Sequence, residues 1–248
     1  MIGEGTRQLD LYDFFSIFIP GASLLLGVVP LIPQSVHMPP AAIIAVLIVG
    51  GVVVGRGIHA ARLWIEENAG APSHRDEFID EILNPCVLTD DLINQFYLAC
   101  QDNFDNLALP NDRSDLNRQS HADDLDMLYS LVRSKIHMDA RGRSRTFQAV
   151  LDFYGSIWIA SSLLFSLYYS YATIDGLTNG WSTGFGDVIG YQSYLSTYDI
   201  HYAVIAVFAV GVWGGAYYTF YRVRSDYREI YIQYFMSDFV ILQNESGN

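Results

Sequence analysis

Arginine side chains gather near the ends of the most apolar stretches of the chain. The residues concerned are Arg56, Arg62, Arg141, Arg143, Arg145, Arg222, Arg224 and Arg228. A guanidinium group donates two parallel hydrogen bonds to one phosphate, so these side chains suit a nucleotide or an oligonucleotide. Membrane topology signals and anionic lipid headgroups explain the same positions more simply, and both interpretations stay open. The first interpretation assigns ligand binding to Arg141, Arg143, Arg145, Arg222 and Arg224.

A second candidate lies in a loop between two apolar stretches. The chain there reads Trp181-Ser182-Thr183-Gly184-Phe185-Gly186-Asp187, and its Thr-Gly-Phe-Gly-Asp is similar to the potassium-channel filter pattern Thr-Val-Gly-Tyr-Gly-Asp. The resemblance implies a re-entrant loop in which backbone carbonyls from four subunits coordinate a cation. The sequence departs from the pattern because Thr183 directly precedes Gly184. Residues 172–180, where a pore helix would lie, contain turn-forming residues instead.

Histidine and aspartate residues cluster in the polar middle of the chain. The cluster comprises His121, Asp123, Asp124 and Asp126, followed by His137 and Asp139. A divalent ion could bind His121 and Asp124 on one helix face, but aspartate is an ordinary capping residue and so acidic a chain produces such clusters by chance. The sequence has no Ser-His-Asp grouping, phosphate-binding glycine loop or Cys-x-x-Cys motif. We therefore expect no metal, no cofactor and no enzymatic activity.

Four apolar stretches must position these candidate residues. They cover residues 12–32, 41–57, 150–173 and 202–221, and each has about the 20 residues that a helix needs to cross a bilayer. Pro20 lies inside the first stretch and is expected to kink it. The sequence predicts an all-α membrane protein with four transmembrane helices in two hairpins and a small helical cytoplasmic insert.

The distribution of basic residues predicts the orientation of the chain in the membrane. Residues 33–40 and 174–201 contain no Lys or Arg, and all fourteen basic residues lie elsewhere. Cytoplasmic loops of membrane proteins are enriched in these residues. We therefore expect a multi-pass protein of the cell membrane with both termini in the cytoplasm.

The same pattern divides the chain into four parts. The first hairpin spans residues 1–65, the cytoplasmic helical domain 66–146, and the second hairpin 147–223 with an outer loop at 174–201; residues 224–248 form a C-terminal cytoplasmic helix. Helical periodicity within the insert predicts helices at 74–83, 90–101 and 122–136, with a loop at 102–120. So small a bundle is marginal alone and needs support from the membrane part or a neighbouring subunit.

The composition carries information about the surroundings of the protein. Hydrophobic residues make up 51% of the 248 residues and charged residues 17%, whereas about 25% is usual for charged residues in soluble proteins. There are 20 Asp and 7 Glu against 13 Arg and one Lys, which gives a net charge of −13. This acidic, lysine-poor composition resembles that of proteins from extremely salt-loving archaea, where multimolar salt screens such self-repulsion. A dedicated basic partner is the alternative explanation.

Small residues occur at several points in the apolar stretches. They include Gly50, Gly51 and Gly55, then Gly155 with Ser156, and finally Gly211, Gly214 and Gly215. Such patches allow close helix contacts, either within one chain or between subunits of a homo-oligomer. No ionisable residue lies near the centre of a stretch, which argues against a proton-coupled transporter.

The start of the first stretch and the overall plan resemble a known class of proteins. Leu11-Tyr12-Asp13-Phe14-Phe15 runs into Pro20-Gly21, and the chain resembles the small multi-pass membrane effectors of prokaryotic antiviral operons, such as the Hailong type. That resemblance implies a membrane oligomer held or released by a nucleic-acid-like ligand from a nucleotidyltransferase encoded nearby. Three hypotheses stay open: this pore-forming effector, a cation channel that uses Thr183, Gly184, Phe185, Gly186 and Asp187 as its filter, and a non-catalytic scaffold for a soluble partner.

Overall fold

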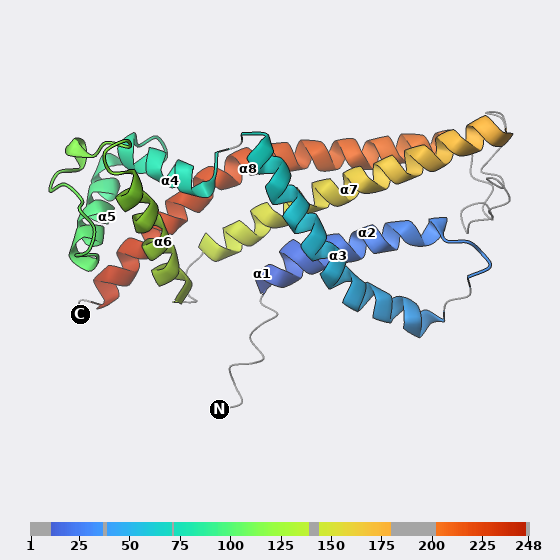
Figure 1. The fold of residues 1–248 in the computed structure, drawn as a ribbon, viewed down its shortest axis with the longest axis horizontal. Coiled ribbons are helices and arrows are strands. Elements are labelled where there is room, and N and C mark those ends of the chain that lie inside the picture. The colour runs from blue at the N-terminus through green and yellow to red at the C-terminus, as the bar shows by residue number, and fades with distance from the viewer. Residues whose placement is uncertain (1–10, 37–38, 71, 139–143, 180–201, 247–248) are drawn as a thin grey trace, which may run out of the picture. The chain divides into compact units, whose positions relative to one another are not determined.

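The computed structural model describes residues 11–36, 39–70, 72–138, 144–179 and 202–246, and these residues form helices and no β-strand (Figure 1). The chain divides into two compact units. Residues 1–65 and 149–224 belong to the first, here called the apolar unit, and residues 66–148 and 225–248 belong to the second, here called the acidic unit. The predicted all-helical class is confirmed for the described residues.

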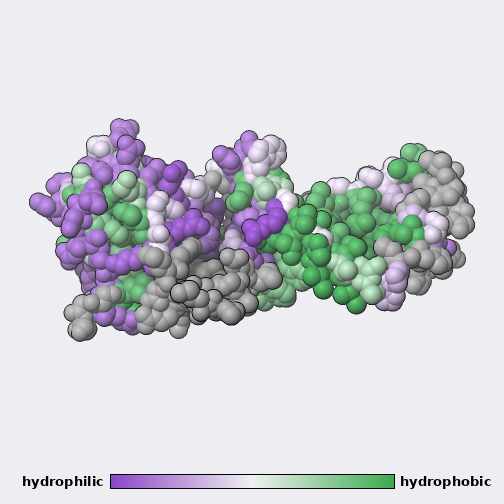
Figure 2. Space-filling model, turned by 60° about the horizontal axis from the view of Figure 1, so that its bottom comes forward, coloured by the Kyte–Doolittle hydropathy of each residue, from purple (hydrophilic) through white to green (hydrophobic). Residues whose placement is uncertain are grey.

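Three helices are long and apolar enough to cross a membrane within the described residues. They cover Phe14–Leu31, Pro40–Asn68 and Thr146–Leu177, while the shorter apolar run Val204–Phe220 takes the place of the fourth predicted span. The described residues therefore contain three membrane-spanning candidates, and the fourth predicted span is not confirmed. Figure 2 shows the hydrophobic surface of this part of the chain, where Val53, Val207 and Phe208 are among the exposed side chains. Exposed apolar surface of this extent indicates a membrane environment.

The first apolar stretch changes its helix type before Pro20. Helix α1 (Leu11–Asp13) passes into a π-helix η1 (Phe14–Phe18), which is followed by α2 (Ile19–Val28) and the 3₁₀ turn η2 (Val29–Leu31). The backbone N–H of Ile19 bonds to the carbonyl of Phe14. Pro20 has no N–H to continue an α-helical ladder, and the preceding turn widens to the π type.

Glycines let the helices of the apolar unit pack closely. Helix α3 (Pro40–Asn68) lies against the first stretch, where a Cβ on Gly21 would come within 2.0 Å of the Gly51 carbonyl oxygen. A Cβ on Gly55 would lie 2.0 Å from the carbonyl oxygen of Ile17. Backbone atoms meet at both points, so these two glycines make the helix pairing possible. The patch around Gly51 therefore serves packing within the chain.

Helices α7 (Ser144–Asn179) and α8 (Tyr202–Ser246) run side by side in the apolar unit (Figure 1). The rings of Trp158 and Phe220 stack with centroids 5.5 Å apart, and the Trp213 indole N–H donates to Ser162 Oγ at 2.9 Å. Helix α7 continues to Asn179, so the turn predicted within residues 172–180 is wrong for residues 172–179, and Gly180 lies outside the described residues. A glycine inside a helix, such as Gly176, lowers helix stability by about 1 kcal/mol relative to alanine, and tertiary packing readily compensates for this loss.

The acidic unit is built from four helical segments. Helices α4 (His74–Leu83), α5 (Asp90–Asn103) and α6 (Ala122–Met138) lie within two residues of the predicted bounds, and the polar stretch between the last two contains one 3₁₀ turn, η3 (Arg113–Asp115). The fourth segment is the end of α8, which was predicted as a separate helix over residues 224–248. No glycine or proline interrupts residues 216–245, and the helix simply continues.

The core of the acidic unit is aromatic and depends on that fourth segment. Phe78 of α4 contacts Phe96 of α5 and Phe235 of α8 edge-on, with ring centroids 5.7 and 5.6 Å apart. Phe239 of α8 lies 5.4 Å from Phe96, and all four rings are fully buried. The three predicted insert helices thus gain from α8 the apolar cover that they lack alone.

Candidate functional site

A buried ion pair connects two long helices of the apolar unit. Arg62 on α3 and Asp152 on α7 are 5% and 2% exposed, and Arg62 Nη2 lies 2.5 Å from Asp152 Oδ1. Ninety positions separate the two residues in the sequence. Charges buried this deeply are rarely tolerated unless they are paired and hydrogen-bonded.

The N-terminal helix joins the same ion pair. The hydroxyl of Tyr12 on α1 donates to Asp152 Oδ2, so both carboxylate oxygens are satisfied. Ser16, which is fully buried, donates from Oγ to the Tyr12 carbonyl at 2.6 Å. Tyr12, Arg62 and Asp152 are called the charge cluster below. It ties together three segments that are far apart in the sequence.

Gly155 allows the arginine to reach its partner. A Cβ at this position would lie 2.4 Å from Arg62 Cδ and 3.0 Å from Phe220 Cε2. Three helices, α3, α7 and α8, therefore meet at one glycine. One position further, the buried Ser156 hydroxyl has no hydrogen-bond partner among the described residues.

The charge cluster has the chemistry of a structural junction. Arginine keeps its proton under all ordinary conditions, and the cluster contains neither a thiol nor an imidazole. Its energetic importance is large because removing one partner of a buried pair costs roughly 3–5 kcal/mol. The cluster can therefore fix the register of three helices, and its loss would release them.

The arginines predicted to bind a ligand are placed only in part. Arg141 and Arg143 lie outside the described residues, and Arg145 and Arg224 lie on α7 and α8 with side chains outside the description. Arg222 is exposed and donates from Nη1 to the Tyr218 hydroxyl at 3.2 Å. Of these five side chains, the structure therefore describes only that of Arg222.

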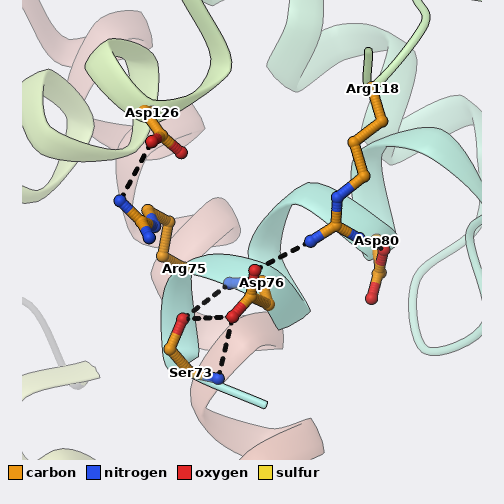
Figure 3. A network of polar contacts seen from close by, with 6 residues as sticks. All are labelled: Ser73, Arg75, Asp76, Asp80, Arg118 and Asp126. Carbon is orange, nitrogen blue, oxygen red and sulfur yellow. Dashed lines mark hydrogen bonds and ion pairs between the residues drawn. The ribbon is translucent and has the colours of Figure 1, made fainter. Parts of the chain in front are cut away.

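Other arginines are occupied by carboxylates of the same chain. In the network of Figure 3, Arg118 binds Asp76 at 2.7 Å and also binds Asp80, while Arg75 binds Asp126 at 3.0 Å. Ser73 caps α4 through a reciprocal pair of bonds with Asp76, and these bonds lower the pKa of that carboxyl below its ordinary value. These contacts neutralise the charge of Arg75 and Arg118 within the unit, so these two guanidinium groups are less available to a phosphate ligand.

Two further pairs follow the same pattern. Arg113 binds Asp90 at 2.7 Å and also donates to the Ile82 carbonyl at 3.0 Å. Arg228, one of the arginines singled out from the sequence, binds Glu77 at 2.7 Å. Local ion pairing therefore accounts for its position near the end of an apolar stretch.

The histidine–aspartate cluster is also engaged in local contacts. His121 Nδ1 lies 3.1 Å from the Asn117 carbonyl oxygen, and Asp124 accepts a bond from the Ala108 N–H at 3.4 Å. Asp126 is held by Arg75. Within the described residues no group of three His, Cys, Asp or Glu side chains is arranged to hold a metal ion.

The filter-like segment from Thr183 to Asp187 lies outside the described residues. The pairing of Arg62 with Asp152 was not predicted from the sequence, although Arg62 lies near the end of an apolar stretch. The one available signal was the presence of single opposite charges within a few residues of two apolar stretches. Pairing across ninety residues is not visible in any local pattern.

Comparison with known proteins adds no relative. No protein-family model, no curated protein and no solved structure matches this chain.

Proposed function

We propose that the chain is an oligomeric integral membrane protein whose apolar helices form a pore and whose acidic unit receives the signal that opens it. One observation carries this proposal. Helix α8 is a single 45-residue helix that supplies the apolar run Val204–Phe220 to one unit and the core residues Phe235 and Phe239 to the other. An event that repacks the aromatic core therefore acts on the same helix that reaches into the membrane.

The proposed arrangement has four membrane passes and cytoplasmic termini. The nineteen residues from 202 to 220 would rise about 28 Å as an α-helix, close to the ~30 Å of a bilayer core. The distribution of Lys and Arg supports the orientation. Gly211, Gly214 and Gly215 supply space for association, because a Cβ at any of them would meet nothing within 4 Å.

The proposed ligand is a polyanion such as a nucleotide or oligonucleotide, bound by Arg141, Arg143, Arg145, Arg222 and Arg224. Support comes from contrast: Arg75, Arg113, Arg118 and Arg228 are paired with carboxylates, whereas the exposed Arg222 donates to a neutral hydroxyl. A role in antiviral defence with a partner enzyme encoded nearby extends the proposal and follows the family resemblance.

The test measures the mass of the detergent-solubilised complex at high salt, together with its absorbance ratio at 260 and 280 nm. We expect a symmetric oligomer that carries nucleic-acid absorbance and that releases a trapped dye from liposomes. A clean monomer without ligand or dye release would contradict the proposal. Arg113→Gln, which changes an arginine already bound to Asp90, serves as the control for Arg222→Gln in ligand retention.

A scaffold for a soluble basic partner is the second candidate. It is favoured by the acidic unit, which holds 20 acidic and 9 basic residues and has a net charge of −11. The same measurement separates the two functions, because a scaffold releases no dye. The cation-channel alternative is tested by Gly184→Ala with Gly186→Ala, which should abolish conduction only if that loop is the filter.

A further inference from the structure

The charge cluster lies beside the places where the chain leaves the apolar unit. The chain passes between the units at residues 65/66, 148/149 and 224/225. Arg62 and Asp152 each lie within four residues of one of the first two crossings. Phe220, which meets Arg62 across Gly155, lies five residues before the third. All three crossing segments therefore converge on one small region of the apolar unit.

We propose that Tyr12, Arg62 and Asp152 form a latch that couples the conformation of the acidic unit to the packing of the membrane helices. Opening of the latch is the step that gates the pore. The gating role rests on the function proposed above, whereas the coupling role does not depend on whether the helices conduct.

A buried ion pair suits this task better than apolar contacts would. Apolar side chains that slide past one another keep most of their contacts, so small displacements are possible at every intermediate position. An ion pair between groups 5% and 2% exposed has one good geometry, and separating it takes the opposite charge away from two buried charged groups. Intermediate positions are disfavoured, and the junction behaves as a two-state element.

The first helix must move with the latch. Tyr12 bonds to the same carboxylate as Arg62, and the backbone of Ile17 lies against Gly55 of α3 without room for a side chain. A shift of α3 away from α7 therefore pulls on both the hydroxyl bond and the glycine contact. The latch engages the N-terminal helix as well as the two crossing helices.

The chain contains a matched control for the latch. Asp13 of α1 and Arg56 of α3 form another aspartate–arginine pair, and it joins two of the three segments that the latch connects. Their contact is 3.5 Å long, and the Arg56 side chain is 63% exposed. Exposed pairs contribute little because water replaces the partner. Breaking this pair changes charge at the same junction without opening the latch.

The experiment compares Asp152→Asn with Asp13→Asn in the full chain, using amide hydrogen exchange. We expect exchange of residues 12–16 and 149–156 to become at least about tenfold faster in Asp152→Asn, because the local opening equilibrium shifts. Asp13→Asn should exchange like the parent chain. Parent-like exchange at 149–156 in a folded Asp152→Asn protein would overturn the proposal.

A double variant covers the case in which Asp152→Asn does not fold. Arg62→Met with Asp152→Leu replaces the pair by apolar side chains, a change that buried pairs often tolerate. Phe235→Ala then loosens the core of the acidic unit in both backgrounds. We expect it to accelerate exchange at 149–156 only where the ion pair is present. Equal acceleration in both backgrounds would overturn the coupling.

Tyr12→Phe provides the mildest test. It removes one hydroxyl bond and keeps the ion pair, so the protein should fold and exchange should rise at residues 12–16. Unchanged exchange there would contradict the three-part latch.

Dye release from liposomes is measured on the same samples to separate the two proposals. Coupling without dye release in any variant would reject the pore and leave the latch standing. Dye release that is the same in the parent and in every latch variant would reject the gating role of the latch and leave the pore.

Discussion

The two units of the molecule differ in how many charged residues they contain and in how deeply their ion pairs are buried. The apolar unit has 7 acidic and 5 basic residues, and its central pair, Arg62 with Asp152, is buried. The acidic unit has 20 acidic and 9 basic residues, and it contains exposed pairs such as that between Arg118 and Asp80, with side chains 46% and 58% exposed. One buried pair determines the register of several helices, whereas exposed pairs individually contribute about 0–1 kcal/mol.

The buried carboxylate of the acidic unit extends this contrast. Glu81 is 3% exposed and accepts bonds from the backbone N–H groups of Cys86, Val87 and Leu88. Backbone donors, rather than an arginine, satisfy it, and the loop after α4 is thereby fixed. The hydrogen bond to Glu81 also raises the pKa of the Cys86 thiol. The buried Glu81 thus fixes one loop in the acidic unit, whereas the buried pair of Arg62 and Asp152 holds helices together in the apolar unit.

Salt dependence should give the largest difference between the units. Lowering the salt from the multimolar range to about 0.1 M extends the Debye length to about 10 Å, so the net charge of −11 repels itself within the acidic unit. We expect that unit to lose its structure while the apolar unit stays protected outside residues 12–16 and 149–156, where the latch opens, as measured by hydrogen exchange. Full protection of α4–α6 in dilute buffer would contradict the halophilic interpretation.

Truncating a core ring should affect the acidic unit next most strongly. Phe235 is fully buried against Phe78 and Tyr129, with centroids 5.6 Å from each. Phe235→Ala should cost roughly 3–5 kcal/mol, seen as a lower denaturation midpoint at constant high salt. Ile241→Ala changes an exposed residue of the same helix and should leave the midpoint near that of the parent.

Replacing glycines by alanine in the apolar unit should have different effects at glycines with close neighbours and at glycines with open space around them. Gly155→Ala forces a methyl group against Arg62 and should cost roughly 1–3 kcal/mol. Gly215→Ala meets nothing within 4 Å and should be neutral or slightly stabilising in the single chain. Thermal stability in detergent measures both. Strong destabilisation by Gly215→Ala in the oligomer alone would indicate that this face lies between subunits.

The smallest expected effect concerns the cap of α4. Ser73→Ala removes the two bonds that the Ser73 hydroxyl makes with Asp76 and keeps the bond from the Ser73 backbone N–H, and it should cost about 1 kcal/mol at neutral pH. Because the bond from the hydroxyl to the carboxylate lowers the pKa of Asp76 from its ordinary 3.8, its contribution is present above that value and disappears as the pH falls through the lowered folded-state pKa. The difference between the parent and the variant should therefore become smaller in acid. A difference that stays constant down to pH 2 would contradict this assignment.

The sequence predicts helices well where local signals are strong. Ser73 and Thr89 precede α4 and α5, aspartates occupy their first turns, and the predicted starts at 74 and 90 are confirmed. The continuous α8 and the end of α7 were not predicted, because each predicted helix ended where its apolar stretch ended, whereas the observed helices continue into polar sequence. The charge cluster could not be predicted, since pairing of Arg62 with Asp152 depends on tertiary packing. The five ligand-binding arginines and the filter-like loop remain predictions.

The π-helical turn at Phe14–Phe18 determines which side of the following helix faces α3. A π turn contains about one residue more than an α turn, as though a single residue had been inserted into an ordinary helix. Deleting one residue there would convert the wide turn into an ordinary α turn and leave Gly21 facing Gly51 and Tyr12 in place, whereas a deletion within α2 would rotate everything beyond it by about 100°. This turn is therefore a point where the chain can lose one residue without changing the pairing of the helices.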